Sequence, residues 1–283
     1  METGQKTTLT NNNTNQSEYN VLSIQVSLSG LSFCVLNTKD NKFSFFKEYL
    51  FDQHLNPNTL LDKLIHCFNS ETALQQNFKN VNVIHDNEVS TLVPKPLFNE
   101  DYLADYLKFN SKILRTDYIT YDEILINDSV NVYVPYVNIN NHIYDRFGEF
   151  EFKHFSTVVL DTILSIEKHA TSPKMYVNVT HNHFEVITLK NSKLKLYNTF
   201  EYATKEDFIY YILFAIEQLN YNPEELPLIF VGKISKEDEL YNIAYKYIRD
   251  ISIFEMQKDN TFESSVRNDL FHNFALINSF KCG

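Results

Sequence analysis

Hydrophobic and polar positions alternate along the first part of the chain with the two-residue period of β-strands. This period predicts strands at residues 20–27, 31–37 and 42–51, joined by short polar turns. Apolar residues then recur at helical spacing, and Asn56 and Pro57 stand where a helix begins. A helix is therefore predicted over Thr59–Phe68. Its apolar face consists of Leu60, Leu61, Leu64, Ile65 and Phe68.

Shorter patterns complete the first half of the chain. Buried strands are predicted at Val81–His85 and Thr91–Pro94, the second ended by its proline. Asn99 is a suitable N-cap for a helix that runs to about Phe109. The remaining predicted elements are strands at 130–136 and 150–155 and a helix at 156–169.

The same order of patterns then begins again. Three strands are predicted at 174–180, 183–190 and 193–202, and Thr204 caps a helix over 206–220. The last predicted elements are a buried strand at 228–231, a helix at 236–249, a strand at 251–254 and a helix near 268–278.

A gapless overlay tests whether the second half repeats the first. A shift of 153 positions, the separation of Gln25 and Asn178, also places Glu48 on Glu201, and the helices that follow overlap. Coincidence is the alternative, because any hairpin followed by a helix gives some similarity. Three strands and a helix in one register favour an internal duplication. The boundary between the two lobes is predicted near residues 171–173.

The length, charge and hydrophobic pattern of the chain argue against two classes of protein, those that bind nucleic acid and those that insert into membranes. A chain of 283 residues, 43% of them hydrophobic, is long enough for two lobes with their own cores. The net charge of −11 argues against the basic stripe that nucleic-acid binding requires. No apolar run approaches the roughly 18 residues of a membrane-spanning helix. We therefore expect neither nucleic acid binding nor membrane insertion.

The N-terminal segment and the cysteines bear on the compartment. Residues 1–18 are rich in Asn, Thr and Gln, so they bury too little apolar surface to offset ordering entropy, and a disordered tail is predicted. The segment lacks the apolar core of a secretory signal. Cys34, Cys67 and Cys282 form no close pair of the kind found in disulfide frameworks or zinc sites. These features predict a cytoplasmic protein.

Sequence motifs give no conventional catalytic site. The chain has only five glycines, and no Walker-type loop, GxGxxG, GxSxG or HExxH motif is present. His181 and His183 flank a predicted hairpin turn and are a conceivable metal pair. No cysteine or regularly spaced carboxylate completes such a site. Polar turn residues are the simpler interpretation, and we assign no metal ligand.

Two repeats of three strands, a helix, a strand and a further helix resemble the actin-like ATPase architecture, whose two lobes each have a ribonuclease-H-like core. Short motifs are also similar to those of a family of uncharacterised bacterial proteins assigned to this fold, a domain of unknown function. They are Thr91-Leu-Val-Pro94, Leu97-Phe98, Tyr106-Leu-Lys-Phe-Asn110 and His154-Phe-Ser-Thr157. The resemblance covers nearly all of residues 19–283. It implies a two-lobed α/β protein with mixed sheets, lobe I at 19–172 and lobe II at 173–283.

The resemblance also implies where a nucleotide would bind. In ATP-using members the turn after the first strand of each lobe reads Asp-x-Gly. The Asp acts on the phosphates through Mg²⁺ and water, and the Gly permits close backbone approach. Those positions are Gln25 and Ser27 in lobe I and Asn178 and Thr180 in lobe II. Neither amide supplies the negative charge that holds Mg²⁺, so no catalytic residue is predicted.

A third implied element is the glycine pair of the adenosine-binding turn. Here the turn reads Ile229-Phe-Val-Gly-Lys233, so Gly232 remains and Lys233 replaces the second glycine. Gly232 could form the floor of a nucleotide pocket with Lys233 near a phosphate. The simpler interpretation is a strand-to-helix turn that requires a glycine.

Two functions remain open at this point. The first is a non-catalytic binding or scaffold module with an unknown protein partner and no cofactor; cytoplasmic pilus and secretion assembly proteins of this fold are an analogy. The alternative is an ATP-binding or phosphotransfer protein that uses Mg-ATP with displaced acids, for which Asp52, Asp128 and Asp161 are candidates. A carboxylate in an open cleft at the predicted site would favour the alternative. Aromatic side chains filling the cleft would favour the first.

Overall fold

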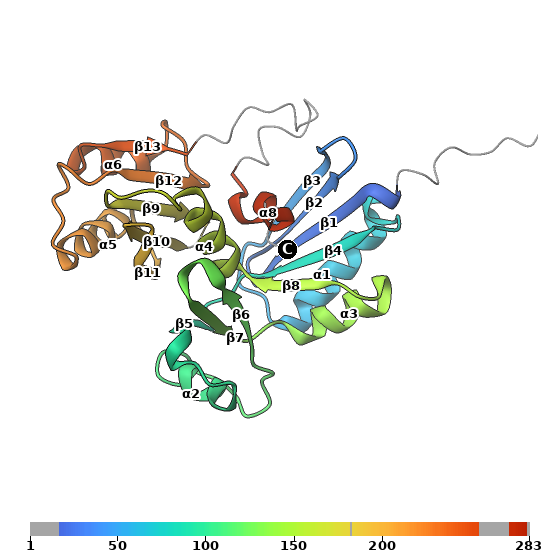
Figure 1. Ribbon diagram of the computed structural model, residues 1–283. Coiled ribbons are helices and arrows are strands. Elements are labelled where there is room, and N and C mark those ends of the chain that lie inside the picture. Colours follow the sequence, from blue (N-terminus) through green and yellow to red (C-terminus); the bar gives the residue numbers. More distant parts are fainter. Residues whose placement is uncertain (1–16, 182, 255–271, 282–283) are drawn as a thin grey trace, which may run out of the picture.

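The computed structural model describes residues 17–181, 183–254 and 272–281. Two five-stranded mixed sheets lie on either side of a pair of helices, and a smaller three-stranded sheet lies beside them (Figure 1). The predicted α/β class with two ribonuclease-H-like halves is confirmed. No helix among the described residues is both long enough and apolar enough to cross a membrane.

The first sheet has the strand order β3-β2-β1-β4-β8. Its strands are β1 (Asn20–Ser27), β2 (Gly30–Asn37), β3 (Lys42–Leu50), β4 (Asn80–His85) and β8 (Glu151–His154). The first three strands are antiparallel, whereas β4 and β8 run parallel to β1. Helices α1 (Pro57–Ser70) and α3 (Val137–Phe147) cover the outer face, where Leu60, Leu64 and Ile143 are fully buried.

The second sheet repeats this arrangement in the order β11-β10-β9-β12-β13. Its strands are β9 (Lys174–Val179), β10 (His183–Lys190), β11 (Lys193–Glu201), β12 (Leu228–Gly232) and β13 (Ile251–Ile253). Helices α5 (Lys205–Gln218) and α6 (Glu239–Tyr247) cover its outer face. Thr204 begins α5 with a capping box, because its side chain accepts from the Asp207 backbone amide and the Asp207 carboxylate accepts from that of Thr204.

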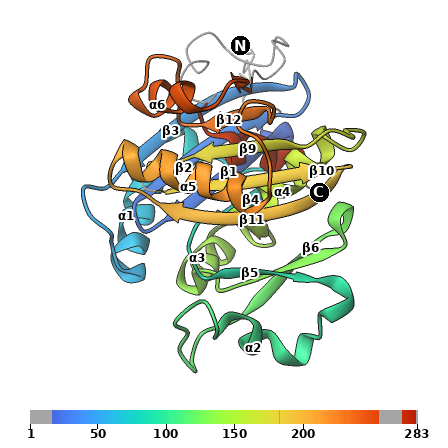
Figure 2. The same cartoon turned by 90° about the vertical axis from the view of Figure 1, so that its left-hand side faces the viewer.

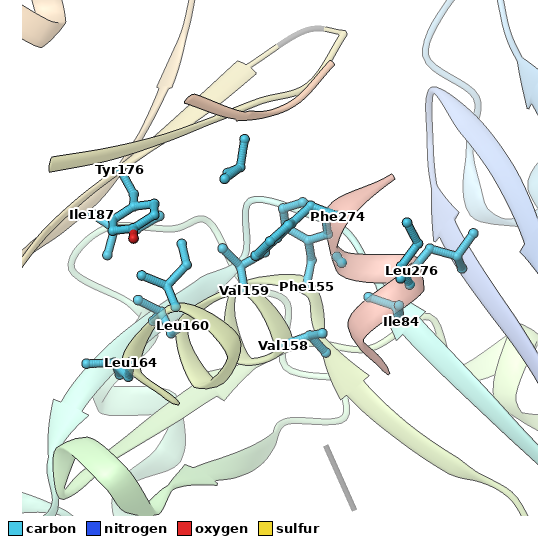
Figure 3. Packing of buried hydrophobic residues seen from close by; sticks show 14 of the residues in the cluster. Ile84, Phe155, Val158, Val159, Leu160, Leu164, Tyr176, Ile187, Phe274 and Leu276 are labelled. Atoms are coloured by element: carbon cyan, nitrogen blue, oxygen red, sulfur yellow. The ribbon is translucent and has the colours of Figure 1, made fainter. Parts of the chain in front are cut away.

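Two helices fill the space between the sheets, and each one faces the sheet of the other half. They are α4 (Phe155–Ile166), which follows β8, and α8 (Phe274–Asn278), near the end of the chain. Leu160 and Leu164 of α4 lie beside Tyr176 of the second sheet, whereas Leu276 of α8 lies beside Ile84 of the first (Figure 3). The shared apolar cluster therefore joins both halves into one core.

The internal repeat is confirmed in the topology, but the gapless overlay is correct only for the first hairpin. Gln25 pairs with Ser32 in β2, and the shifted positions Asn178 and Glu185 pair in the same way in β10. In the third strand the register differs, because Glu185 pairs with Thr199 and not with Glu201. Helix α5 begins at residue 205, whereas the shift would carry the start of α1 to 210. Loop lengths therefore differ between the halves.

An insert between β4 and β8 forms the third sheet, in the order β5-β7-β6. Its elements are β5 (Ser90–Pro94), α2 (Leu103–Leu107), β6 (Thr120–Ile124) and β7 (Ser129–Tyr133). Short 3-10 turns complete the described chain at Ser17–Tyr19, Thr72–Leu74, Lys95–Leu97, Glu100–Tyr102, Leu125–Asn127 and Ser279–Lys281.

The His154-Phe-Ser-Thr157 motif joins the insert to the central helices. The His154 Nδ1 atom accepts from the Ser156 backbone amide at 3.2 Å and so caps α4. Asn131 of β7 donates to the hydroxyls of Ser156 and Thr157, both at 3.0 Å. The motif thus connects the insert to α4 through hydrogen bonds of buried side chains.

Some predicted elements need correction. Strand β6 and helix α3 were not predicted, α2 is shorter than the helix expected to Phe109, and α6 begins at Glu239 rather than near 236. The tail at 1–18 lies outside the described residues except for its last two, which begin a 3-10 turn. The first part of the helix expected near 268–278 is also outside them. The lobe boundary at 172/173 stays a prediction.

Candidate functional site

The predicted site residues Gln25, Ser27, Asn178, Thr180 and Lys233 all line one cavity, which lies between the two sheets. We call it the inter-sheet cavity. Its volume is about 60 Å³, which is well below the roughly 300 Å³ at which ligand pockets usually begin. Whether it binds a nucleotide stays a prediction.

Gln25 is engaged with a carboxylate that the sequence did not single out. Its Nε2 atom donates to Asp86 Oδ2 at 3.0 Å. Asp86 follows β4, the parallel neighbour of β1, and its backbone amide donates to Val26 O at 2.9 Å. Burial raises the pKa of Asp86, while the nearby His183 and the hydrogen bond from Gln25 act in the opposite direction. The Gln25 amide therefore serves as a donor to an internal acid.

Asn178 has a matching arrangement in the second sheet. Its Nδ2 atom donates to Glu185 Oε2 at 2.7 Å, and the Tyr197 hydroxyl donates to Glu185 Oε1 at 2.7 Å. Burial raises the pKa of Glu185 to about 7, although both hydrogen bonds and the nearby His183 act against this rise. At each of the two positions for which the resemblance implies an acid, an amide thus donates to a carboxylate one strand away.

The raised pKa of Glu185 predicts a pH-dependent stability. Between pH 4.5 and about 7 the folded state binds more protons at this residue than the unfolded state. Its contribution to the free energy of unfolding is therefore fully present below pH 4.5 and falls as the pH rises to about 7. The expected fall is on the order of 3 kcal/mol. Urea unfolding at several pH values should show this slope in the unmodified protein and lose it in Glu185→Gln.

Glu224→Gln provides the control for this pH series, because Glu224 is exposed and does not line the cavity. That variant should retain the slope of the unmodified protein. An identical slope in Glu185→Gln would show that other groups cause it.

Lys233 connects the two halves across the cavity. Its Nζ atom donates to Glu48 Oε1 of β3 and lies 2.6 Å from His181 Nε2. The Ser32 hydroxyl donates to the same Glu48 oxygen at 3.2 Å. Burial acts to raise the pKa of Glu48, but the hydrogen bonds and charges of His181 and Lys233 outweigh it and lower that pKa to about 2. Lys233 is thus committed to an internal ion pair.

Gly232 lies directly beside the cavity, at the end of β12, where its φ is +83°. A Cβ atom built on it would lie 2.3 Å from Val179 O and 2.6 Å from Asn178 Oδ1. Glycine is therefore required here for two structural reasons: the backbone has a positive φ, and it lies too close to β9 to leave space for a Cβ atom. This supports the structural interpretation of the turn.

The residues around the cavity fit Mg-nucleotide poorly. Both amides are used as donors, Lys233 is ion-paired, and Phe155 and Phe274 form part of the wall. Among the described residues no three His, Cys, Asp or Glu side chains are arranged to hold a metal ion. The displaced acids proposed from the sequence do not lie here: none of Asp52, Asp128 and Asp161 lines the cavity.

Three carboxylates that line the cavity or bind its residues were not predicted as site residues, although the sequence indicated the place of each. Asp86 stands directly after a strand predicted to be buried, and side chains at the ends of parallel neighbouring strands meet at one sheet edge. Glu185 is seven residues from Asn178 in a tight hairpin, which makes it a cross-strand neighbour. Glu48 faces Ser32 in the same manner. Counting strand register in each hairpin would have found the last two.

Solved structures show the fold of this chain. A protein of actin-like ATPase fold and unknown function from Bacteroides thetaiotaomicron is similar with a TM-score of 0.76 and 24% identity, over 92% of this chain and 96% of that one. A chain of the PilM–PilN type IV pilus biogenesis complex gives 0.59 and 7%, over 92% and 98%. The ethanolamine utilization protein EutJ from Carboxydothermus hydrogenoformans gives 0.50 and 6%, over 91% and 89%.

At these identities the likeness establishes the actin-like ATPase fold alone. No curated protein sequence matches this chain. The sequence profile of a family described as "Protein of unknown function (DUF3822)" matches residues 9–251, which is most of the chain. The resemblance drawn from the short sequence motifs is therefore confirmed, and the chain belongs to the DUF3822 family.

Proposed function

We propose that this chain is a non-catalytic actin-like-fold protein that acts by binding a protein partner. The observation that carries the proposal is the pair of amides at the positions for which the resemblance implies an acid. Gln25 donates to Asp86 and Asn178 donates to Glu185, so each amide satisfies an internal carboxylate. An amide used in this way offers neither charge to Mg²⁺ nor a base to a nucleophile.

The contacts of Lys233 give further support. The ion pair with Glu48 joins the two sheets across the inter-sheet cavity, and the remaining space is about 60 Å³. A likeness to a chain of a pilus assembly complex adds a fold-level analogy for protein binding. Two cysteines in the described chain, Cys34 and Cys67, are free and buried, which agrees with the proposed cytoplasmic location.

One observation favours the alternative of ATP binding with displaced acids. Asp86 and Glu48 are carboxylates that line the same cavity as Gln25 and Asn178. We favour partner binding because Glu48 is neutralised by Lys233, and because burial raises the pKa of Asp86 and so opposes the charged form that would hold Mg²⁺.

Thermal unfolding with and without millimolar Mg-ATP or Mg-ADP tests this proposal. A ligand at 100 times its dissociation constant would add roughly 2.7 kcal/mol of stability. For a chain of this size that corresponds to a rise in the unfolding midpoint of several degrees. We expect a shift of less than about 1 °C, which is small beside such a rise. A clear, Mg²⁺-dependent rise would contradict the proposal.

Lys233→Met is the informative variant, because it removes the ion pair and keeps an apolar stem in place. If the paired amides are what prevents nucleotide binding, this variant also shows no shift. A shift that appears only in Lys233→Met would mean that the ion pair merely blocks a competent site, and the alternative function would then be preferred.

A further inference from the structure

A second and much larger depression, which we call the groove, lies between the insert and the second sheet. Its volume is about 1050 Å³, at the upper end of the range for ligand clefts. One wall is the insert, from Ser90 to Leu92 and at Tyr118; another is the second sheet, from Tyr197 to Thr199. Residues 134–138, which lead into α3, line it from the side of the first sheet.

Two sheet edges border the groove. Strand β11 ends the second sheet and pairs only with β10, and β5 ends the insert sheet and pairs only with β7, as far as the described chain extends. Figures 1 and 2 both place these two strands beside each other. At one end of β11 the insert contacts this strand directly: the backbone amide of Leu194 donates to Asn127 Oδ1 of the insert at 3.2 Å. An edge strand offers unpaired backbone groups to an added strand.

The groove is rich in acidic side chains. Carboxylates line it, and neither a lysine nor an arginine is among the described residues that do so. The accessible lining acids are Glu88, Asp117 and Glu201. Asp86 and Glu185 also line the groove but contribute less charge, because burial raises the pKa of each, and three histidines, His54, His154 and His183, lie among them. The chain as a whole has a net charge of −11, so no distant excess of positive charge offsets this field. The charge complementary to the groove is that of lysine or arginine side chains.

Two of these acids approach each other from different elements. Glu88, in the loop before β5, contacts Glu201, the last residue of β11. This contact, followed by burial, raises the pKa of Glu88. The two carboxyl groups therefore resist being charged together, and a cation placed beside both would favour the charged form of each.

We propose that an extended segment of the protein partner, bearing lysine or arginine side chains, binds in this groove and adds as a strand beside β11. Beyond the insert contact at Leu194, β11 continues to Glu201, which is long enough to direct such pairing. The Thr199 backbone amide donates to the Asn198 side chain at 3.1 Å, and an added strand would replace that contact. Alternate side chains of an added strand point to opposite faces, so a basic residue at every second position would reach the acidic wall. This inference rests on the proposed function and names the chemistry of the partner.

A fluorescently labelled ten-residue peptide of alternating lysine and valine tests the inference by fluorescence anisotropy with the full chain. We expect saturable binding at physiological ionic strength, and none for the matching peptide of glutamate and valine. The lysine peptide methylated at every backbone nitrogen keeps its charge but has no backbone donor for β11, so it should bind at least about tenfold more weakly.

A pair of matched double variants then locates the binding. Glu88→Gln with Glu201→Gln should weaken the lysine peptide roughly tenfold, with an unchanged or higher unfolding midpoint because a repulsion is removed. Glu224→Gln with Glu225→Gln changes the net charge equally at exposed positions outside the groove and should leave binding unaltered.

Equal weakening by both pairs would overturn the inference, since net charge alone would then explain the affinity. Absence of binding up to millimolar peptide, or full competition by spermidine at equal charge, would overturn it as well. The spermidine result would indicate a small-cation site instead. None of these outcomes bears on nucleotide binding. If the peptide does not bind and Mg-ATP gives no shift in the unfolding midpoint, the proposed function still holds, and the partner binds to another surface.

Discussion

Gly232→Ala should lower the free energy of unfolding by on the order of 4 kcal/mol, because two costs add at one position. The φ of +83° is unfavourable for any residue with a Cβ atom, typically by 1–3 kcal/mol. The new methyl group would also lie 2.3 Å from Val179 O, so β12 and β9 would have to separate. Urea unfolding followed by far-UV circular dichroism measures the difference.

Gly148→Ala is the matched control for this measurement. Gly148 has a similar φ of +79°, and a Cβ atom built on it meets nothing within 4 Å. The control should therefore lose only the backbone cost, about 2 kcal/mol. Equal losses in the two variants would show that the contact with β9 is unimportant. A Gly232→Ala chain that fails to fold while Gly148→Ala folds would be the same result in stronger form.

Leu276→Ala is expected to destabilise both halves of the molecule by about 3 kcal/mol. Leu276 is fully buried, and it belongs to α8, which packs on β1 and β2 of the first sheet. Truncating a buried leucine removes apolar burial and leaves a cavity. Because α8 and α4 share one cluster with both sheets, the loss should extend beyond the local contacts.

Hydrogen exchange distinguishes a shared loss from a local one. In Leu276→Ala the backbone amides of β1 and β2 should exchange faster than in the unmodified protein, together with those of the second sheet. Leu97→Ala, at an exposed leucine of the insert, should change stability by less than about 0.5 kcal/mol. Faster exchange confined to β1 and β2 of the first sheet would contradict a common core.

Much of the fold was predictable because hydrophobic residues recur along the sequence with the regular spacing of strands and helices. The strands of both hairpins, α1 and α5 carry clear periods, so their boundaries were close to those observed. Helix α3 was missed because its asparagines are poor helix formers, although Ile139, Ile143 and Phe147 follow helical spacing. Strand β6 was missed because its apolar alternation is interrupted by Asp122, a half-buried acceptor for the hydroxyls of Tyr133 and Thr157.

The candidate site was predictable in its positions but not in its partners. Resemblance and the internal repeat placed Gln25 and Asn178 at equivalent positions near the end of the first strand of each half, and the structure brings both to one cavity. The ion pair of Lys233 with Glu48 joins residues 185 positions apart, and no local pattern encodes it. The groove is likewise a product of how the insert lies against the second sheet, which sequence periodicity does not describe.

Helices α4 and α8 each pack against the sheet of the other half, and this arrangement has a consequence for protein synthesis. The hydroxyl of Ser23 in β1 is hydrogen-bonded to that of Ser279, just after α8, across 256 residues. At 5–20 residues per second, β1 is made roughly 13 to 50 s before this partner leaves the ribosome. During that time the inner face of the first sheet lacks the contacts that α8 makes with β1 and β2. Translation of most of the chain therefore precedes the closing of its core.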